Sequence, residues 1–330
     1  MIDKYGRKIE YVRISVTDRC NFRCIYCMPE GGIQWQQPET LLTDDEILCA
    51  VRAFARLGIS RIKVTGGEPL LRENIESLIK AIKAVPGIET VTLTTNGVLL
   101  SKKLQKLYEA GLDGINISID AVTPEGFERL TGCGTKRQLE AVQTAIREAM
   151  TFKDMYVKLN CVPIKGVNDS DCRALLEYAK TTDIAVRFIE MMPIGLGKRF
   201  EAVTEEDIKA MLGVPMRQVF VSCEYGGGPC RYYRPEGYRG LVGFISAVSH
   251  KFCDSCNRLR LTSDGFLKTC LQYDCGEDLR EIVRSIPKNE VDIKLDAAIK
   301  KAILNKPKAH HFESGSDKDD EQKKMFQIGG

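Results

Sequence analysis

The sequence lacks both an excess of one charge and any long apolar run. Lysine and arginine total 48 residues against 45 for aspartate and glutamate, so no broad basic surface is available for a nucleic acid or an anionic membrane. No apolar run reaches the length of a membrane span. The first residues, MIDKYGRKIEYV, have neither the apolar stretch of a secretory signal nor the composition of a transit peptide. These absences predict a cytoplasmic protein with no nucleic acid and no membrane as partner.

Cysteine, in contrast, is plentiful. With 330 residues, 43% of them hydrophobic, the chain can bury one large core or two moderate ones without disulfide bonds. It nevertheless contains 13 cysteines, an odd number. In a reducing compartment such cysteines act as metal ligands or as buried free thiols, and their clustering has to distinguish the two.

Strand and helix patterns alternate from residue 9 to residue 191. A β-branched segment predicts a strand at 9–16, and TDDE at 43–46 is a capping box ahead of an apolar helical stripe. Further strands are predicted at 60–65, 89–94, 113–120, 155–162 and 184–191, and further helices at 73–84, 101–110, 138–150 and 170–180. Each strand is a nearly continuous apolar run, as in parallel strands covered on both faces. Six such strands indicate a βα barrel or partial barrel, with function at the carboxyl ends of the strands.

A second region begins where this alternation breaks, beyond about residue 204. Glycine and proline turns are followed by a predicted hairpin at 258–270 and a helix at 291–304. Residues 314–324, SGSDKDDEQKK, are polar and predicted to be mobile. We therefore expect a barrel at 1–220, a C-terminal region at 221–313 and a mobile tail at 314–330 that ends in two glycines.

Three cysteines are crowded into the loop after the first strand: Cys20, Cys24 and Cys27. They could be packing residues, a zinc site or the ligands of an iron–sulfur cluster. Packing is the weakest interpretation because charged residues flank the loop. A structural zinc site needs four protein ligands, and no fourth cysteine or histidine lies nearby. Three thiolates suit a cubane cluster in which one iron stays open.

A second set of cysteines lies near the other end of the chain. Cys253 and Cys256 precede the predicted hairpin, which would return Cys270 beside them. Zinc remains an alternative here, with His250 or Cys275 as the fourth ligand. Arg258 and Arg260 alternate along a strand and therefore face the same side, where two guanidinium groups would suit a polyanion such as a phosphate chain.

The first cysteine loop, CNFRCIYC, resembles the signature of the radical S-adenosylmethionine (SAM) superfamily. The GGEP segment at 66–69 resembles that superfamily's segment for the amino end of the cofactor. The segments RISVTDRCNFRCIYCMP, TGGEPLLR, TTNG, RFIEMMPIG and FCDSCNRLRLTSDGFLKTCL, with the terminal glycine pair, look like the GTP 3′,8-cyclases, the molybdenum cofactor biosynthesis protein A family. The resemblance implies an α/β fold, a partial (βα)6 TIM-like radical SAM barrel with a C-terminal auxiliary-cluster region.

The resemblance also implies a lyase activity with two 4Fe-4S clusters and SAM. The first cluster cleaves SAM, and the resulting 5′-deoxyadenosyl radical takes the 3′ hydrogen of GTP. Cyclisation then gives (8S)-3′,8-cyclo-7,8-dihydroguanosine 5′-triphosphate, an early step in molybdenum cofactor (molybdopterin) biosynthesis. The second cluster holds the guanine. The family further implies a homodimer whose product passes to cyclic pyranopterin monophosphate synthase.

Site residues are carried over from the family position by position. The implied ligands are Cys20, Cys24 and Cys27 for the first cluster and Cys253, Cys256 and Cys270 for the second. The implied SAM contacts are Tyr26, Gly67, Ser118 and Met192, and the implied GTP contacts are Arg13, Lys63, Thr94, Lys158, Arg258 and Arg260. Arg13, Arg258, Arg260, Gly329 and Gly330 are the implied catalytic residues, the two glycines by entering the active site. Thr94 and Ser118 could instead merely end strands, Met192 could be core packing, and Lys158 could be an exposed strand residue.

Lys63 and Arg187 differ from the other cationic candidates. The family more often has arginine at the position of Lys63, and lysine keeps the charge but loses the bidentate fork. Arg187 is a further candidate for the barrel interior because it is a charge within an apolar strand run.

Two other functions remain open. A radical SAM peptide-modifying enzyme would also have an auxiliary cluster, although such enzymes typically use more cysteines there. A zinc-ribbon binding protein would explain the second cysteine pair, but the balanced charge argues against it. The remaining cysteines are predicted to be packing or incidental thiols, and His310 and His311 are given no role.

Overall fold

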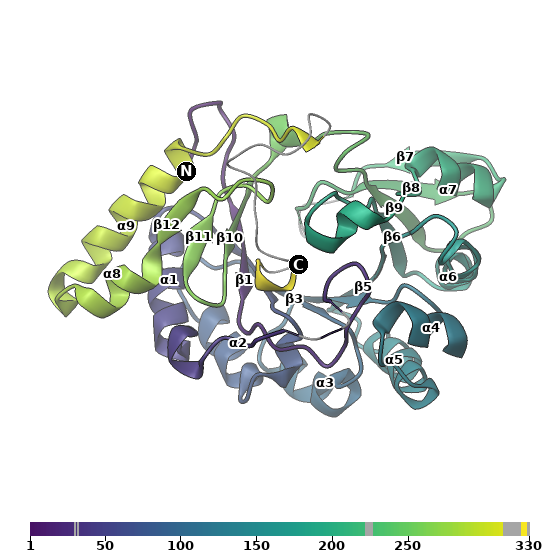
Figure 1. Cartoon of the computed structure of the whole chain (residues 1–330), viewed down its shortest axis with the longest axis horizontal. Helices are drawn as coiled ribbons and strands as arrows, with labels where there is room; N and C mark the ends of the chain where they lie inside the picture. Colours follow the sequence, from purple (N-terminus) through teal and green to yellow (C-terminus); the bar gives the residue numbers. More distant parts are fainter. Residues whose placement is uncertain (30, 32, 222–226, 313–324, 329–330) are drawn as a thin grey trace.

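The computed structural model describes residues 1–29, 31, 33–221, 227–312 and 325–328. One 12-stranded sheet runs through these residues, and it is curved into an open barrel (Figure 1). Its strands are β1 (Tyr11–Ser15), β2 (Arg61–Thr65), β3 (Thr90–Thr95), β4 (Gly114–Ser118), β5 (Tyr156–Cys161), β6 (Ala185–Ile189), β7 (Met216–Val219), β8 (Arg231–Pro235), β9 (Leu241–Ile245), β10 (Arg258–Leu261), β11 (Phe266–Lys268) and β12 (Gly276–Asp278).

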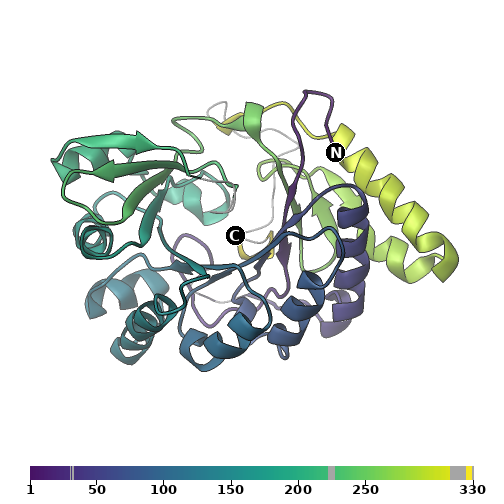
Figure 2. The same cartoon turned by 180° about the vertical axis from the view of Figure 1, so that it is seen from behind.

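The predicted partial barrel is confirmed by strands β1 to β6. They are neighbours in sequence order, and every pair is parallel. Parallel neighbours need a crossover connection, and the intervening helices provide it. These helices lie on the outer side of the curved sheet, so that its concave side opens onto a central space (Figures 1 and 2).

The helices begin where the sequence provides caps. Thr43 and Thr135 each form a capping box with the residue three positions later, which fixes the first turns of α1 and α5. The helices are α1 (Asp44–Arg56), α2 (Ile75–Lys83), α3 (Leu100–Glu109), α4 (Pro124–Thr131), α5 (Lys136–Ala149), α6 (Asp169–Thr181), α7 (Glu205–Leu212), α8 (Leu279–Ser285) and α9 (Lys288–Leu304), with 3-10 turns at Pro38–Thr40, Pro69–Leu71, Gly195–Arg199, Cys253–Ser255 and Met325–Gln327. Each helix predicted from the sequence is present, with ends shifted by a few residues.

The segments after residue 212 extend the barrel at both edges. β10 pairs in parallel with β1 and continues into β11 and β12 through the predicted hairpin. At the other edge β9 pairs in parallel with β6 and leads to β8 and β7. The two sheet edges are thus formed by residues of the same C-terminal part of the chain. The predicted division at residue 220 stays a prediction.

The sequence predicted barrel strands that are apolar on both faces, and this prediction is wrong for the inner face. Val12 and Ile14 have no exposed surface and point toward the outer helices, whereas Arg13 and Lys63 are register partners on the inner face. The inner residues alternate with the outer ones because side chains of a strand point to opposite faces. The interior of this barrel is therefore a polar cavity wall and not a packed core. No helix within the described residues is long and apolar enough to cross a membrane.

Candidate active site

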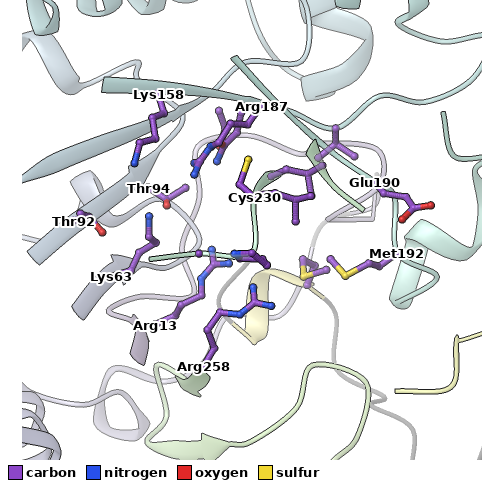
Figure 3. Close-up of a pocket in the computed structure, with 18 of the residues that line it drawn as sticks. Arg13, Lys63, Thr92, Thr94, Lys158, Arg187, Glu190, Met192, Cys230 and Arg258 are labelled. Atoms are coloured by element: carbon purple, nitrogen blue, oxygen red, sulfur yellow. The ribbon is translucent and has the colours of Figure 1, made fainter. Parts of the chain in front are cut away.

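A cavity of about 700 Å³ occupies the concave side of the sheet. This volume is typical of a site for a small ligand or cofactor. Of the residues predicted for the site, those that line it are Arg13, Cys20, Cys24, Tyr26, Cys27, Lys63, Gly67, Thr94, Ser118, Lys158, Arg187, Met192, Arg258 and Arg260. Figure 3 shows several of these side chains converging on the same space from different strands. The residues predicted for the site thus lie together around one cavity, and their individual roles stay predictions.

The first cysteine set lies at one end of this cavity. Its loop is fixed to α4 by two backbone hydrogen bonds: the amide of Arg23 donates to the carbonyl of Thr131 at 2.8 Å, and that of Ile25 donates to the carbonyl of Leu130 at 3.0 Å. Burial raises the pKa of Cys20 to about 11, and burial together with the neighbouring Cys20 raises the pKa of Cys27 to about 12. Burial and then the neighbouring Cys27 raise the pKa of Cys24 well above its usual value. Thiolates this close together repel one another. The three groups can therefore ionise together only if a positive centre, such as a metal cluster, lies between them. The set thus has the chemistry of metal-cluster ligands.

The GGEP segment packs directly on the cysteine loop. The amide of Gly67 donates to the carbonyl of Thr17 at 2.7 Å, and that of Glu68 donates to the carbonyl of Arg19 at 2.7 Å. A Cβ on Gly67 would lie 2.2 Å from the carbonyl oxygen of Arg19. The glycine is therefore required for the approach of two loops, a different reason from the approach to a ligand that the sequence suggested.

Glu68, which is buried, and Asp120, which is half-buried, are carboxyl groups on the cavity wall beside this loop. Glu68 accepts from the hydroxyl of Thr95 and the amide of Asn96, each at 2.7 Å. Burial raises the pKa of Glu68 to about 7. Asp120 accepts from the Tyr26 hydroxyl at 2.6 Å, and burial raises the pKa of Asp120 to about 6. The Tyr26–Asp120 bond orients the aromatic ring that precedes the last cysteine of the loop.

Positive side chains form the opposite part of the wall. Arg260, Arg13, Lys63 and Thr92 are successive register partners across β10, β1, β2 and β3. Burial lowers the pKa of Lys63 well below its usual value, and the charges of Arg187, Lys158 and Arg13 lower it further. Burial, followed by the charge of Arg187, lowers the pKa of Lys158 to about 7. These shifts describe cations that repel one another in a buried space, as expected at a site built for an anion.

Arg187 is held rigidly within this group. Its Nε donates to Asn160 Oδ1 at 2.9 Å, and its Nη2 donates to Asn116 Oδ1 and to Asn160 Oδ1, each at 2.5 Å. Arg187 was predicted from the sequence as a residue of the barrel interior, but the two asparagines were not. They stand at alternate positions of apolar strands, and this alternation is the signal that could have identified them.

The second cysteine set lies next to the cavity but does not line it. Asn257 and Arg258, which follow Cys256, are wall residues, whereas Cys253, Cys256 and Cys270 are partly buried and do not line the cavity. Burial raises the pKa of Cys256, but the charges of Arg258 and Lys306 and hydrogen bonds from Arg258 outweigh burial and lower this pKa to about 6. Cys256 is therefore in an environment that favours the thiolate, the form that binds metals.

The zinc alternative receives no support from the arrangement of side chains. Among the described residues, no three histidine, cysteine, aspartate or glutamate side chains are grouped around one ion. The exposed His250 lies 3.8 Å from Glu206, and the sulfur of Cys275 lies 3.2 Å from the hydroxyl of Thr269. A cubane cluster is larger than one ion, so its ligands need not converge on a single point.

The C-terminal 3-10 turn reaches into the cavity. Met325 and Phe326 line it, and the ring of Phe326 packs edge-on against Trp35, with 6.5 Å between the ring centroids. The catalytic role predicted for Gly329 and Gly330 lies outside the described residues, as do most of the residues predicted to form a mobile tail. Cys230, predicted to be incidental, is on the cavity wall close to Arg187 (Figure 3).

Comparison with known proteins agrees with this geometry. Residues 14–179 match the radical SAM superfamily, and residues 184–312 match the family described as Molybdenum Cofactor Synthesis C. A GTP 3′,8-cyclase of Clostridium perfringens (strain SM101 / Type A) is 41% identical over the whole length of both chains. A GTP 3′,8-cyclase of Petrotoga mobilis is 40% identical, again over the whole of both chains.

Solved structures show the same fold at low sequence identity. Streptococcus suis SuiB bound to S-adenosylmethionine aligns with a TM-score of 0.59 and 12% identity, covering 90% of this chain and 68% of SuiB. SuiB bound to its precursor peptide SuiA gives the same TM-score and identity, covering 92% of this chain and 72% of SuiB. At this identity the likeness concerns the fold alone. From the full-length relatives and the two matched families, this chain belongs to the GTP 3′,8-cyclase family of the radical SAM superfamily.

Proposed function

We propose that the cavity is the site at which this chain cyclises GTP to (8S)-3′,8-cyclo-7,8-dihydroguanosine 5′-triphosphate, in the pathway to the molybdenum cofactor. The observation that carries the proposal is the presence of two chemically different ends in one cavity. Three thiols line one end and buried cations line the other. Such a cavity suits a metal-bound cofactor facing a polyanionic substrate.

Cys20, Cys24 and Cys27 would hold a 4Fe-4S cluster, with SAM beside Tyr26, Gly67, Ser118 and Met192. When bound, the cluster and SAM supply the radical chemistry that removes hydrogen from the 3′ carbon of GTP. The protein fixes the geometry of this end of the cavity. The Tyr26–Asp120 hydrogen bond of 2.6 Å and the loop contacts of Gly67 keep the cysteine loop and the GGEP segment in one arrangement.

The triphosphate would bind to the cations of the opposite wall: Arg13, Lys63, Lys158, Arg258 and Arg260. Arginine and lysine that are already desolvated lose little hydration when an anion arrives, so their interaction with phosphate is strong. Arg187, fixed by Asn116 and Asn160, keeps this wall positive in the absence of substrate. Thr94 is a hydroxyl donor on the same wall. Cys253, Cys256 and Cys270 would hold a second 4Fe-4S cluster next to Asn257 and Arg258, where it could contact the guanine.

Some parts of the proposal rest on family membership. They are a homodimeric state, transfer of the product to cyclic pyranopterin monophosphate synthase, a cytoplasmic location and the entry of Gly329 and Gly330 into the site. The peptide-modifying alternative gains no support from SuiB, which shares only the fold at 12% identity, whereas the curated relatives above are GTP 3′,8-cyclases at more than three times that identity. We therefore favour GTP as the substrate.

The GTP assignment is tested by binding measurements on Lys63. We expect Lys63→Met to weaken GTP binding about 10- to 100-fold, because the variant loses a charge-assisted hydrogen bond to phosphate. Lys63→Arg should retain binding because the positive charge remains. Isothermal titration calorimetry of anaerobically reconstituted protein measures both affinities.

Lys80→Met is the matched control. Lys80 is an exposed lysine in the last turn of α2, on the outside of the barrel, so this variant should bind GTP like the unaltered chain. Equal GTP affinity in Lys63→Met and Lys80→Met would contradict the placement of the triphosphate on this wall.

A further inference from the structure

Residues 306–311, which follow α9, connect separate parts of the second cysteine region. We call this segment the 306–311 strap. The ring of His310 donates through Nε2 to the carbonyl of Ala247 at 2.7 Å, and the amide of His311 donates to Gln272 Oε1 at 2.6 Å. Ala247 precedes Cys253 in the chain, and Gln272 lies two residues after Cys270. The two histidines therefore anchor the strap across the cysteine segments.

Lys306 is the first residue of the strap and is only 2% exposed. Its amino group donates to the carbonyl of Arg258 at 3.0 Å and also to the carbonyl of Thr269. Arg258 is two residues after Cys256, and Thr269 immediately precedes Cys270. The single amino group thus joins the two segments that carry these cysteines.

Arg7 ties the third cysteine to the same strap. Its Nη1 donates to the carbonyl of Cys253 at 3.0 Å and to that of Lys308 at 2.9 Å, while Nη2 donates to the carbonyl of Pro307 at 2.8 Å. The charge of Arg7 is balanced by Asp3, whose Oδ2 lies 2.6 Å from Nε. Arg7 therefore fixes Cys253 relative to the strap, and its ion pair with Asp3 adds no net charge to the region.

The charge of Lys306 has no such balance. The described residues provide no carboxylate in an ion pair with it, and its hydrogen-bond partners are neutral carbonyl groups. A buried cation is costly unless an opposite charge compensates it. Its amino group contacts the carbonyl of Arg258, two residues after Cys256, and that of Thr269, which directly precedes Cys270, so its charge lies close to both cysteine segments. The groups that can compensate Lys306 are therefore the cysteine thiolates and whatever they bind.

We propose that Lys306 is the positioning residue of the second cysteine set and sets the reduction potential of a 4Fe-4S cluster held there. The proposal rests on the second-cluster assignment made under the proposed function. A cluster with three thiolate ligands is anionic, and taking up one electron makes it more so. A fixed buried cation beside two of the ligands stabilises the reduced form more than the oxidised form, which raises the potential.

The test uses the full chain with Cys20→Ser, Cys24→Ser and Cys27→Ser, so that only the second set can hold a cluster. After anaerobic reconstitution, iron and sulfide are counted, and the cluster is titrated with dithionite under electron paramagnetic resonance. Lys306→Met removes the charge and the hydrogen bonds, whereas Lys306→Gln keeps an N–H donor and removes the charge. Lys306→Arg keeps both, and Lys308→Met removes an exposed charge from the same strap.

We expect Lys306→Met and Lys306→Gln to lower the ratio of reduced to oxidised cluster at least tenfold at a fixed potential. This change corresponds to a shift of about 59 mV toward negative values for a one-electron couple. Lys306→Arg and Lys308→Met should titrate like the parent. Should Lys306→Met fail to fold by circular dichroism, the Gln variant provides the measurement. Loss of iron from folded Met and Gln variants, but not from the Arg variant, would equally support the positioning role.

Two results would overturn the inference, and they differ from a failure of the proposed function. Unchanged potentials in iron-loaded Lys306→Met and Lys306→Gln would show that the charge does not act on the cluster. Loss of iron from Lys306→Arg as well would show that the charge is not what the site requires. In contrast, a parent triple variant that binds no iron would overturn the second-cluster assignment itself, and the inference with it.

Discussion

Lys158 is a lysine on the cavity wall whose protonation changes near neutral pH. Burial and then the charge of Arg187 lower its pKa to about 7, so the free site loses this positive charge as pH rises above that value. Bound phosphate favours the protonated form. Binding of GTP above pH 7 must therefore take up a proton, and affinity must fall as pH rises.

We predict that the dissociation constant for GTP increases by up to about tenfold per pH unit above pH 7 through Lys158 alone. Lys63 adds to this dependence, because its pKa is also lowered by burial. Calorimetric titrations at several pH values measure the slope. Lys158→Met should have a shallower slope than the unaltered chain, and an identical slope in the two proteins would refute the role of Lys158.

Single residues were predictable from the sequence where their chemistry is local. The close spacing of Cys20, Cys24 and Cys27 predicts a ligand set, and all three residues line the cavity. Lys306 could not be recognised in the same way. Its importance comes from contacts with Arg258 and Thr269, which are 48 and 37 residues away in the chain. No local pattern marks such a residue.

Helix α9 contributes to the barrel through one face only. Leu295, Ile299 and Ile303 are completely buried, whereas Ile293 on the same helix is 71% exposed. α9 packs on α1, which covers the outer face of the barrel, and Arg56 of α1 pairs with Asp296 at 2.8 Å. The buried face therefore stabilises the edge of the sheet where β10, β11 and β12 join β1.

We predict that Leu295→Ala lowers the free energy of unfolding by about 2–5 kcal/mol, because it leaves a cavity in a packed core. Ile293→Ala, from the exposed face, should change it by less than about 0.5 kcal/mol. Chemical denaturation of the two variants measures both values. A similar, small effect in both would mean that α9 is not integrated in the barrel core.

Elements were predictable where periodicity and caps agree. The capping box at Thr43 and the apolar stripe after it predicted α1, and the SDG turn predicted the β10–β11 hairpin. The parallel pairing of β10 with β1 was not predictable, because it joins residues 11–14 to residues 258–261. Pairing over such a distance depends on the complete fold. The short helices α4, α7 and α8 were also missed.

The whole molecule explains why two distant cysteine sets can serve one site. Because β10 pairs in parallel with β1, Cys253 and Cys256, which precede β10, lie toward the amino end of β1, whereas the first cysteine loop leaves the carboxyl end of the same strand. Arg258, Arg260 and Arg13 consequently occupy one stretch of wall, although they come from opposite ends of the chain. The fold class and family could be inferred from the sequence, whereas this junction required the structure.

The central claim is that this one cavity cyclises GTP by radical chemistry. The most direct measurement is anaerobic incubation of cluster-loaded protein with SAM, dithionite and GTP deuterated at the 3′ carbon, followed by mass spectrometry. We predict 5′-deoxyadenosine that contains deuterium, together with a cyclised nucleotide, and neither deuterium transfer nor cyclised product when GTP is replaced by ATP. Cleavage of SAM with no deuterium transfer and no GTP-dependent product would contradict the account.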